Sequence, residues 1–454
     1  MDYRKNSEHL LEIDGYSSQG EGVGRLEGMA IFVPGALRGE RVRVALTKVD
    51  KRCAWARIVE LLEPSPMRVE PDCPCYKHCG GCALRHMDYK EELRFKRQKV
   101  DDALERIGGL RLRTSAMHGA RNPFRYRNKA VLPVSTDNKG ELKVGFYRQR
   151  SHQVVDVPSC LLQSPAADRA GRAVRKWMLR RKVSAYDETA LSGLVRHVFV
   201  RTNRKGEALI CLVVNGTRLP HETDLVRTLR ADCPEAVGIV LNTNTRDTNV
   251  ILGAAYRTLW GQDWMEDELC GMRFRLSVPS FFQVNREQTE VLYRRAVDFA
   301  DLSGAELVVD LYCGTGTITL AMARQAKQVI GAEIVAPAVE NARENARLNG
   351  FDNVEFLCAD AGEAAQELAR RGLRPDVVCV DPPRKGISAA VIAAIVEMQP
   401  RRVVYVSCNP ATLARDLKLL EERGYRAERA ETVDLFPRTA HVETVVLMSK
   451  VKGE

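Results

Sequence analysis

The sequence predicts an α/β protein, and three apolar runs in its C-terminal third carry that prediction. Leu307–Tyr312, Val377–Val380 and Val403–Val406 are short runs rich in β-forming residues, the pattern of strands buried on both faces of a parallel sheet. A helix-like stretch, Ile318–Ala323, follows the first run closely. Because such sheets bind ligands where their strands end, we expect a Rossmann-like domain with a nucleoside site. A small β-barrel and a central α/β domain are expected before it.

Composition describes a water-soluble chain with room for two or three domains. Of 454 residues, 45% are hydrophobic and 28% charged, which is ordinary for globular proteins. No apolar run approaches the length of a membrane span, and the first residues, Met1–Asn6, lack the apolar centre of a signal peptide. We therefore expect a cytoplasmic protein with no membrane partner.

The net charge and the number of cysteines restrict the partners and the kinds of site that the chain is expected to have. The chain has 69 Lys and Arg against 59 Asp and Glu, a net charge of +10, which favours a polyanionic partner. Thirteen cysteines in a cytoplasmic chain argue against a disulfide framework and for metal or catalytic roles for some of them.

Residues 1–63 have the pattern of a small β-barrel. Short apolar runs alternate with glycine-rich turns up to Pro64-Ser65-Pro66, as in barrels of the OB type, which bind single-stranded nucleic acid. A β module that only packs against its neighbour is the alternative. The glycine-rich segment Gly20–Gly28 and the string Pro34–Glu40 resemble a TRAM domain, an RNA-binding appendage.

Four cysteines predict a metal centre. Cys73, Cys79 and Cys82 lie close together, and Cys160 is the best candidate for a fourth ligand. Zinc sites more often use paired C-x2-C units, so the spacing leaves zinc and an iron–sulfur cluster both open. Cys75 is a spare thiol in the same loop that could compete with Cys73.

The central region, residues 64–265, alternates strand-like and helix-like segments and predicts a mixed α/β domain. Tyr89–Lys99 is predicted to be a basic amphipathic helix, either a solvated face or a surface beside the RNA-binding module. In Phe124–Lys129, aromatic residues alternate with cations, a pattern suited to phosphates and stacked bases. The polar face of an edge strand would have the same pattern.

A nucleoside site is predicted where the first strands of the C-terminal domain end. The strand ending at Tyr312 is followed by a G-x-G loop that includes Gly314, and the next strand ends at Glu333, where such folds grip a ribose. Asp360 follows a third strand on the adenine side, and Asp381 is followed by two prolines that fix its turn. A third glycine is absent, so S-adenosylmethionine fits better than NAD.

Cys408 stands at the end of the strand Val403–Val406, where α/β sheets place their ligands. Free cysteine also packs as a small apolar residue, so a buried filler and a nucleophile are both open from this segment alone. Glu443 lies in a late apolar strand, Val442–Leu447, where a charge is costly unless it faces a site.

Five strings carry a close resemblance to the RNA uracil-C5 methyltransferases. With the TRAM-like start and the four cysteines, the resemblance covers nearly the whole chain, and the strings are Ser280–Asn285, Asp310–Gly316, Asp381–Gly386, Tyr405–Pro410 and Asp434–Glu443.

The resemblance implies a class I methyltransferase domain over residues 266–454, with S-adenosylmethionine as cofactor, and a [4Fe-4S] cluster on the four cysteines. Matched position by position, Cys408 corresponds to the nucleophile and Glu443 to the base. The residues that match cofactor contacts are Gln283, Tyr312, Glu333 and Asp381, to which the loop pattern adds Gly314 and Asp360.

The resemblance also bears on the substrate. Cluster-bearing members with this N-terminal module act on large-subunit ribosomal RNA, whereas the tRNA enzyme lacks both features, so 23S rRNA is the expected partner. We do not expect the protein to bind DNA, and we expect it to be a monomer. A tRNA uracil-C5 methyltransferase is the alternative enzyme. A non-catalytic RNA-binding iron–sulfur protein in ribosome assembly is the alternative outside enzymes, although a relic has no reason to keep Cys408, Glu443 and the glycine loop.

Overall fold

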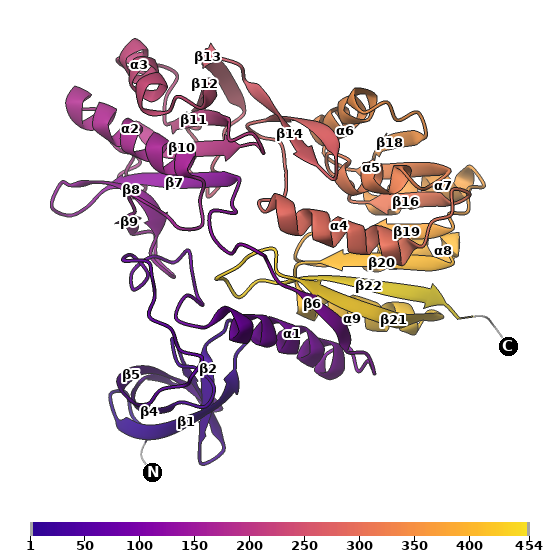
Figure 1. The fold of residues 1–454 in the computed structure, drawn as a ribbon, viewed down its shortest axis with the longest axis horizontal. Helices are drawn as coiled ribbons and strands as arrows, with labels where there is room; N and C mark the ends of the chain where they lie inside the picture. Colours follow the sequence, from indigo (N-terminus) through magenta and orange to yellow (C-terminus); the bar gives the residue numbers. More distant parts are fainter. Residues whose placement is uncertain (1–2, 452–454) are drawn as a thin grey trace.

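The N-terminal module is a closed five-stranded barrel in the computed structural model, which describes residues 3–451 (Figure 1). Neighbouring strands follow the order β1-β2-β3-β5-β4, which confirms the predicted OB-like barrel. Gly24 lets two strands approach closely, because a Cβ there would lie 2.3 Å from the carbonyl oxygen of Glu12. The strands are β1 (Glu8–Tyr16), β2 (Gly22–Leu26), β3 (Met29–Val33), β4 (Arg41–Val49) and β5 (Cys53–Glu63).

The central domain is a seven-stranded mixed sheet in the order β13-β12-β11-β10-β7-β8-β9. Helices α2 (Pro165–Arg181) and α3 (Glu222–Asp232) pack on it around the buried Trp177. β7 lies between β10 and β8, and the aromatic–cation segment ends at its first residue, Lys129, which pairs with Arg201 of β10. The strands are β7 (Lys129–Thr136), β8 (Leu142–Tyr147), β9 (Val154–Asp156), β10 (Val195–Thr202), β11 (Ala208–Val214), β12 (Ala236–Thr243) and β13 (Ala255–Gly261).

The C-terminal domain contains an eight-stranded sheet in the order β18-β17-β16-β19-β20-β22-β21-β6. Its first five strands are parallel, and β22 runs antiparallel to β20. The strands are β6 (Thr114–His118), β16 (Leu307–Leu311), β17 (Gln328–Glu333), β18 (Val354–Cys358), β19 (Val377–Val380), β20 (Arg402–Ser407), β21 (Tyr425–Val433) and β22 (Glu443–Lys450).

Helices cover both faces of this sheet and enclose two apolar cores. The helices are α4 (Arg286–Ala300), α5 (Thr317–Ala323), α6 (Ala336–Leu348), α7 (Ala361–Arg370), α8 (Ala389–Met398) and α9 (Pro410–Glu421). The strand order reverses at β16, between β17 and β19, and such a reversal opens a crevice at the carboxyl ends of the strands. The predicted Rossmann-like domain is therefore confirmed.

Two segments of the expected central unit, residues 64–265, join the C-terminal domain instead. α1 (Tyr89–Arg106) packs on α9, and β6 pairs in parallel with β21 across more than 300 residues of chain. A hairpin of β14 (Trp264–Leu269) and β15 (Met272–Ser277) leads into α4. The chain therefore enters the C-terminal sheet, leaves it to build the central sheet, and returns (Figure 1).

In the part of the chain that the structure describes, no helix is both long and apolar enough to cross a membrane.

Candidate active site

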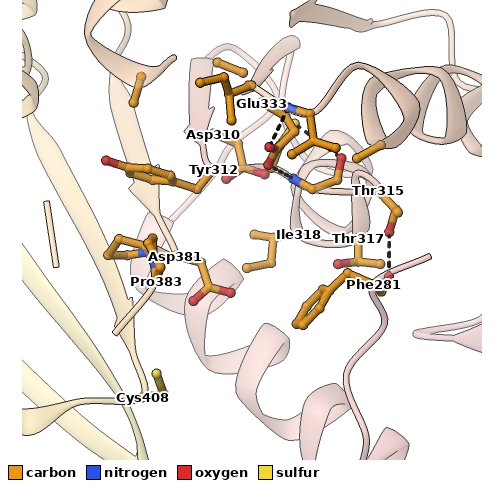
Figure 2. A pocket seen from close by; sticks show the side chains of 18 of the residues that line it. Phe281, Asp310, Tyr312, Thr315, Thr317, Ile318, Glu333, Asp381, Pro383 and Cys408 are labelled. Atoms are coloured by element: carbon orange, nitrogen blue, oxygen red, sulfur yellow. Dashed lines mark hydrogen bonds between the residues drawn. The ribbon is translucent and has the colours of Figure 1, made fainter. Parts of the chain in front are cut away.

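A cavity of about 1120 Å³ opens where the parallel strands of the C-terminal sheet end (Figure 2). It contains the strand-reversal point at β16 and is closed on one side by the segment before α4. All eight residues predicted to bind cofactor or react line it, although they are dispersed over 160 residues of sequence. They are Gln283, Tyr312, Gly314, Glu333, Asp360, Asp381, Cys408 and Glu443.

The glycine loop has a strained backbone. Tyr312, Gly314 and Gly316 all have positive φ, at 69°, 56° and 82°, and a tyrosine in this region is uncommon and costs energy. A Cβ on Gly314 would meet no atom within 4 Å, whereas one on Gly316 would press on Phe356 at 3.1 Å. The loop thus has open space beside Gly314, which lines the cavity, whereas Gly316 is tightly packed against Phe356.

Glu333 closes this loop from the neighbouring strand. Its carboxylate accepts hydrogen bonds from the backbone N–H of Gly314, at 3.1 Å, and of Val335, at 2.9 Å. These two bonds fix the side chain at the end of β17, beside the glycine turn (Figure 2). A carboxylate in this place suits the hydroxyl groups of a ribose.

Two further carboxyl groups lie deeper in the cavity. Burial raises the pKa of Asp381 to about 7, and burial raises that of Asp310 to about 7 despite a hydrogen bond from Thr319. Oδ1 of Asp310 is buried and makes no hydrogen bond. Because buried polar atoms are normally satisfied, this oxygen indicates that a polar or cationic ligand belongs here, as S-adenosylmethionine with its amino and sulfonium groups does.

Asp360 and Gln283 also line the cavity. Oδ1 of Asp360 accepts from the N–H groups of Gly362 and Glu363 at the start of α7, at 2.7 and 3.0 Å. The backbone carbonyl of Gln283 accepts a 2.8 Å bond from Asn128 of the central domain. The central domain therefore helps to position a wall of this cavity.

Cys408 follows β20 and faces Asp381 and Glu443. Burial raises the pKa of the Cys408 thiol to about 11, and the two carboxylates add to that rise while Arg384 opposes it. In Figure 2 the sulfur lies beside Asp381, toward the open cavity. The thiol is therefore protonated at neutral pH and needs a base beside it to become a nucleophile.

Glu443 is the first residue of β22 and is only 4% exposed. Burial and then Asp381 raise the pKa of its carboxyl to about 8, against the effect of Arg384. A carboxyl group with a pKa near neutral pH is suited to exchanging protons with a substrate.

Several cavity residues were missed as site candidates, although four of them lie in strings that the resemblance had already picked out. Asp310, Phe281, Arg384 and His441 line the cavity within those strings, and Thr317 lines it just beyond one of them. Phe281 is 62% exposed, and an exposed aromatic ring in a cavity is a signal that the sequence alone does not give.

The four predicted ligand cysteines lie together around a second cavity of about 110 Å³, which Cys75 also lines. Within residues 3–451, no group of three or more His, Cys, Asp or Glu side chains is suited to hold a single metal ion. Sγ of Cys79 and Sγ of Cys160 accept weak hydrogen bonds from Gly81 and Leu162, at 3.4 and 3.5 Å, as cluster-ligating thiolates do. Zinc and iron–sulfur clusters both take thiolate ligands, so the donor set suits either group.

Comparison with known proteins decides the family. The family model described as tRNA (uracil-5-)-methyltransferase matches residues 88–451, and the TRAM domain model matches residues 4–59. The chain belongs to the RNA (uracil-5-)-methyltransferase family. It is 46% identical to an uncharacterized RNA methyltransferase of Clostridium tetani, over 98% of this chain and 97% of that protein. It is 44% identical to another, of Halalkalibacterium halodurans, with the same coverage.

A solved structure shares almost the whole architecture. The chain is similar to the tRNA (uracil-54, C5)-methyltransferase of Pyrococcus abyssi in complex with S-adenosyl-L-homocysteine, with a TM-score of 0.77 and 27% identity. The match covers 96% of this chain and 99% of that one. This RNA methyltransferase therefore uses S-adenosylmethionine, as its cavity indicates.

Proposed function

We propose that this enzyme methylates C5 of a uridine in 23S rRNA through a covalent bond between Cys408 and C6 of the uracil. The observation that carries the proposal is that Cys408 and Glu443 share one cavity with the cofactor-type residues Glu333 and Asp360. A thiol, a proton acceptor and a methyl donor are the three groups that this reaction needs.

The chemistry explains why each group is there. C5 of uracil is a weak nucleophile. When the sulfur of Cys408 bonds to C6, the C5=C6 electrons move into an enolate with C4=O, and C5 becomes nucleophilic. Asp381 is the carboxyl group beside the thiol that would take its proton, which leaves Glu443 unprotonated for the later step. S-adenosylmethionine, when bound, supplies an electrophilic methyl group for C5.

Release needs a base. Once C5 carries both the methyl group and its original hydrogen, Glu443 would remove that hydrogen as a proton. The electron pair would re-form the C5=C6 bond as the bond between C6 and Cys408 breaks. The sulfur would take back its proton from Asp381, and the proton on Glu443 would pass to solvent, so the free enzyme is recovered. The uracil must leave its stack to reach the cavity.

The choice of 23S rRNA rests on the set of four cysteines, which resembles that of rRNA-acting members. A tRNA substrate is the second candidate, and the Pyrococcus abyssi tRNA enzyme favours it, since that protein matches 96% of this chain. So broad a match includes the barrel, which therefore does not separate the two substrates. Methyl transfer to a 23S rRNA transcript and to tRNA transcripts, measured side by side with labelled cofactor, tests the proposal. Methylation of tRNA alone would overturn the rRNA assignment.

We also propose that Cys73, Cys79, Cys82 and Cys160 hold a [4Fe-4S] cluster, supported by their shared cavity and by the N–H groups directed at two of the sulfurs. Protein purified without oxygen should be brown and contain iron and sulfide in matching amounts. Cys160→Ser should lose the iron, while Cys358→Ser, which changes an exposed cysteine elsewhere, should keep it. Stoichiometric zinc without iron would contradict the cluster.

A further inference from the structure

His441 lies at the active-site cavity among cations that come from three separate segments. Burial lowers its pKa to about 4, and Arg384, Lys99, Lys96 and Arg127 lower it further. Lys99 is on α1, Arg127 precedes β7 and Arg384 follows β19. His441 and Arg384 both line the cavity that contains Cys408 and Glu443. Positive charge is thus concentrated on one side of the reactive thiol.

Three of these cations have no acidic partner. Lys96 is paired with Glu92 and Asp434, but within residues 3–451 Lys99, Arg127 and Arg384 make no ion pair. The ammonium group of Lys99 is half-buried and donates to the carbonyl oxygen of Ala440, at 2.8 Å. Burial, Lys96 and Arg384 lower its pKa to about 8. Holding these like charges together costs energy that only an anion would offset.

The cationic zone continues away from the cavity. Burial, Arg201 and Arg127 lower the pKa of Lys129 to about 8. Arg201 is 1% exposed and donates only to the carbonyl of Ser280, at 2.5 Å, so two of its nitrogens are buried without partners. Arg201 therefore contacts the segment that begins one wall of the cavity.

We propose that Lys99, which is bonded to Ala440 beside the cavity, and Arg384, which lines it, form a clamp for the RNA backbone phosphates on either side of the uridine that reacts with Cys408. The inference rests on the proposed function, because it places the reacting uridine at Cys408. An extruded nucleotide brings its two flanking phosphates to the mouth of the pocket that receives its base. Cations at that mouth hold the base in register without reading its sequence. The clamp is thus a positioning device, separate from the groups that react.

The salt dependence of RNA binding tests the clamp directly. A synthetic RNA hairpin with one uridine in its loop is titrated with wild type, Lys99→Gln and Arg384→Gln at several potassium chloride concentrations. Each lost phosphate contact should reduce the slope of log K against log salt by about 0.7. Lys99→Arg keeps the charge and should restore the slope. Lys176→Gln, which removes an exposed lysine of α2 paired with Asp232, is the control and should leave the slope unchanged.

Replacing one RNA phosphate at a time with an uncharged linkage identifies which phosphate each cation contacts. Methylphosphonate in place of either phosphate flanking the uridine should weaken binding to wild type by roughly ten- to a hundredfold. In Lys99→Gln or Arg384→Gln, the same replacement should weaken binding much less at one of the two positions, because the cation that contacts that phosphate is already gone. Two results would overturn the clamp. One is a salt slope that is unchanged in both variants. The other is a methylphosphonate that, at both positions, weakens binding to each variant as much as it weakens binding to wild type. Because binding is measured without turnover, altered slopes would stand even if neither rRNA nor tRNA proved to be the substrate.

Discussion

The ammonium group of Lys96 on α1 lies 2.7 Å from the carboxylate of Asp434, and both side chains are fully buried. Lys96 also bonds to Glu92 at 2.7 Å and to the carbonyl of Phe436 at 3.1 Å. Asp434 begins the segment that leads to Glu443, so this buried pair ties a segment that lines the cavity to a helix from the N-terminal half. A solvated face was one of two interpretations of this basic helix, and for Lys96 it is wrong.

Lys96→Met should destabilise the protein by about 3–5 kcal/mol, because removing one partner leaves buried carboxylates uncompensated. Urea unfolding measures the loss. Lys90→Met changes an exposed lysine on the same helix and should stay within about 0.5 kcal/mol of wild type. Equal stability of the two variants would show that the pair contributes nothing.

Glu443 should make stability depend on pH. Its pKa is about 8 in the folded protein and near 4.5 when unfolded, so folding takes up a proton between these values. The stabilisation that protonated Glu443 contributes is fully present below the pKa that its carboxyl has in the unfolded chain. It is lost as the pH rises through about 8, the pKa in the folded protein. Between pH 5 and 8, wild type should therefore lose up to about 1.4 kcal/mol per pH unit more than Glu443→Gln. Parallel stability curves for the two proteins would contradict the raised pKa.

Gly314→Ala separates backbone strain from cofactor binding. Gly314 and Gly350 both have positive φ, at 56° and 71°, and a Cβ would meet no protein atom within 4 Å at either. Alanine at each should cost about 1–2 kcal/mol in stability from strain alone. Only Gly314→Ala places a methyl group beside the cofactor cavity, so only it should weaken S-adenosylhomocysteine binding in calorimetry. Equal affinity in both variants would remove Gly314 from the cofactor site.

Local patterns made much of the fold and site predictable. The strand ending at Tyr312 and the strand before Cys408 are short buried runs followed by turns, and each such pattern is complete within ten residues. The pairing of β6 with β21 was not predictable, because it joins Thr114 to Ala430 and no local pattern encodes so distant a partner.

Which charged side chains are buried could not be predicted from the sequence either. A lysine on a polar helix face has the same local pattern whether it meets solvent, as Lys90 does, or two carboxylates, as Lys96 does. The cations around His441 include Lys99 and Arg384, which lie 285 residues apart in the sequence. Their convergence depends on the route of the chain out of the C-terminal sheet and back.

The central claim is that Cys408 attacks C6 and that Glu443 removes the C5 proton afterwards. The order of these steps gives the two variants opposite results. Cys408→Ala should lose turnover and form no covalent complex. Glu443→Gln is nearly the same size but a far poorer base, so it should attack and methylate and then stall, since losing a general base costs a factor of roughly 10²–10⁴.

The most direct measurement is a denaturing gel of wild type and both variants after incubation with substrate RNA and methyl-labelled cofactor. We predict a protein–RNA band that carries the methyl label in Glu443→Gln and is absent in Cys408→Ala. Full turnover by Glu443→Gln, or a covalent band that persists in Cys408→Ala, would contradict the account.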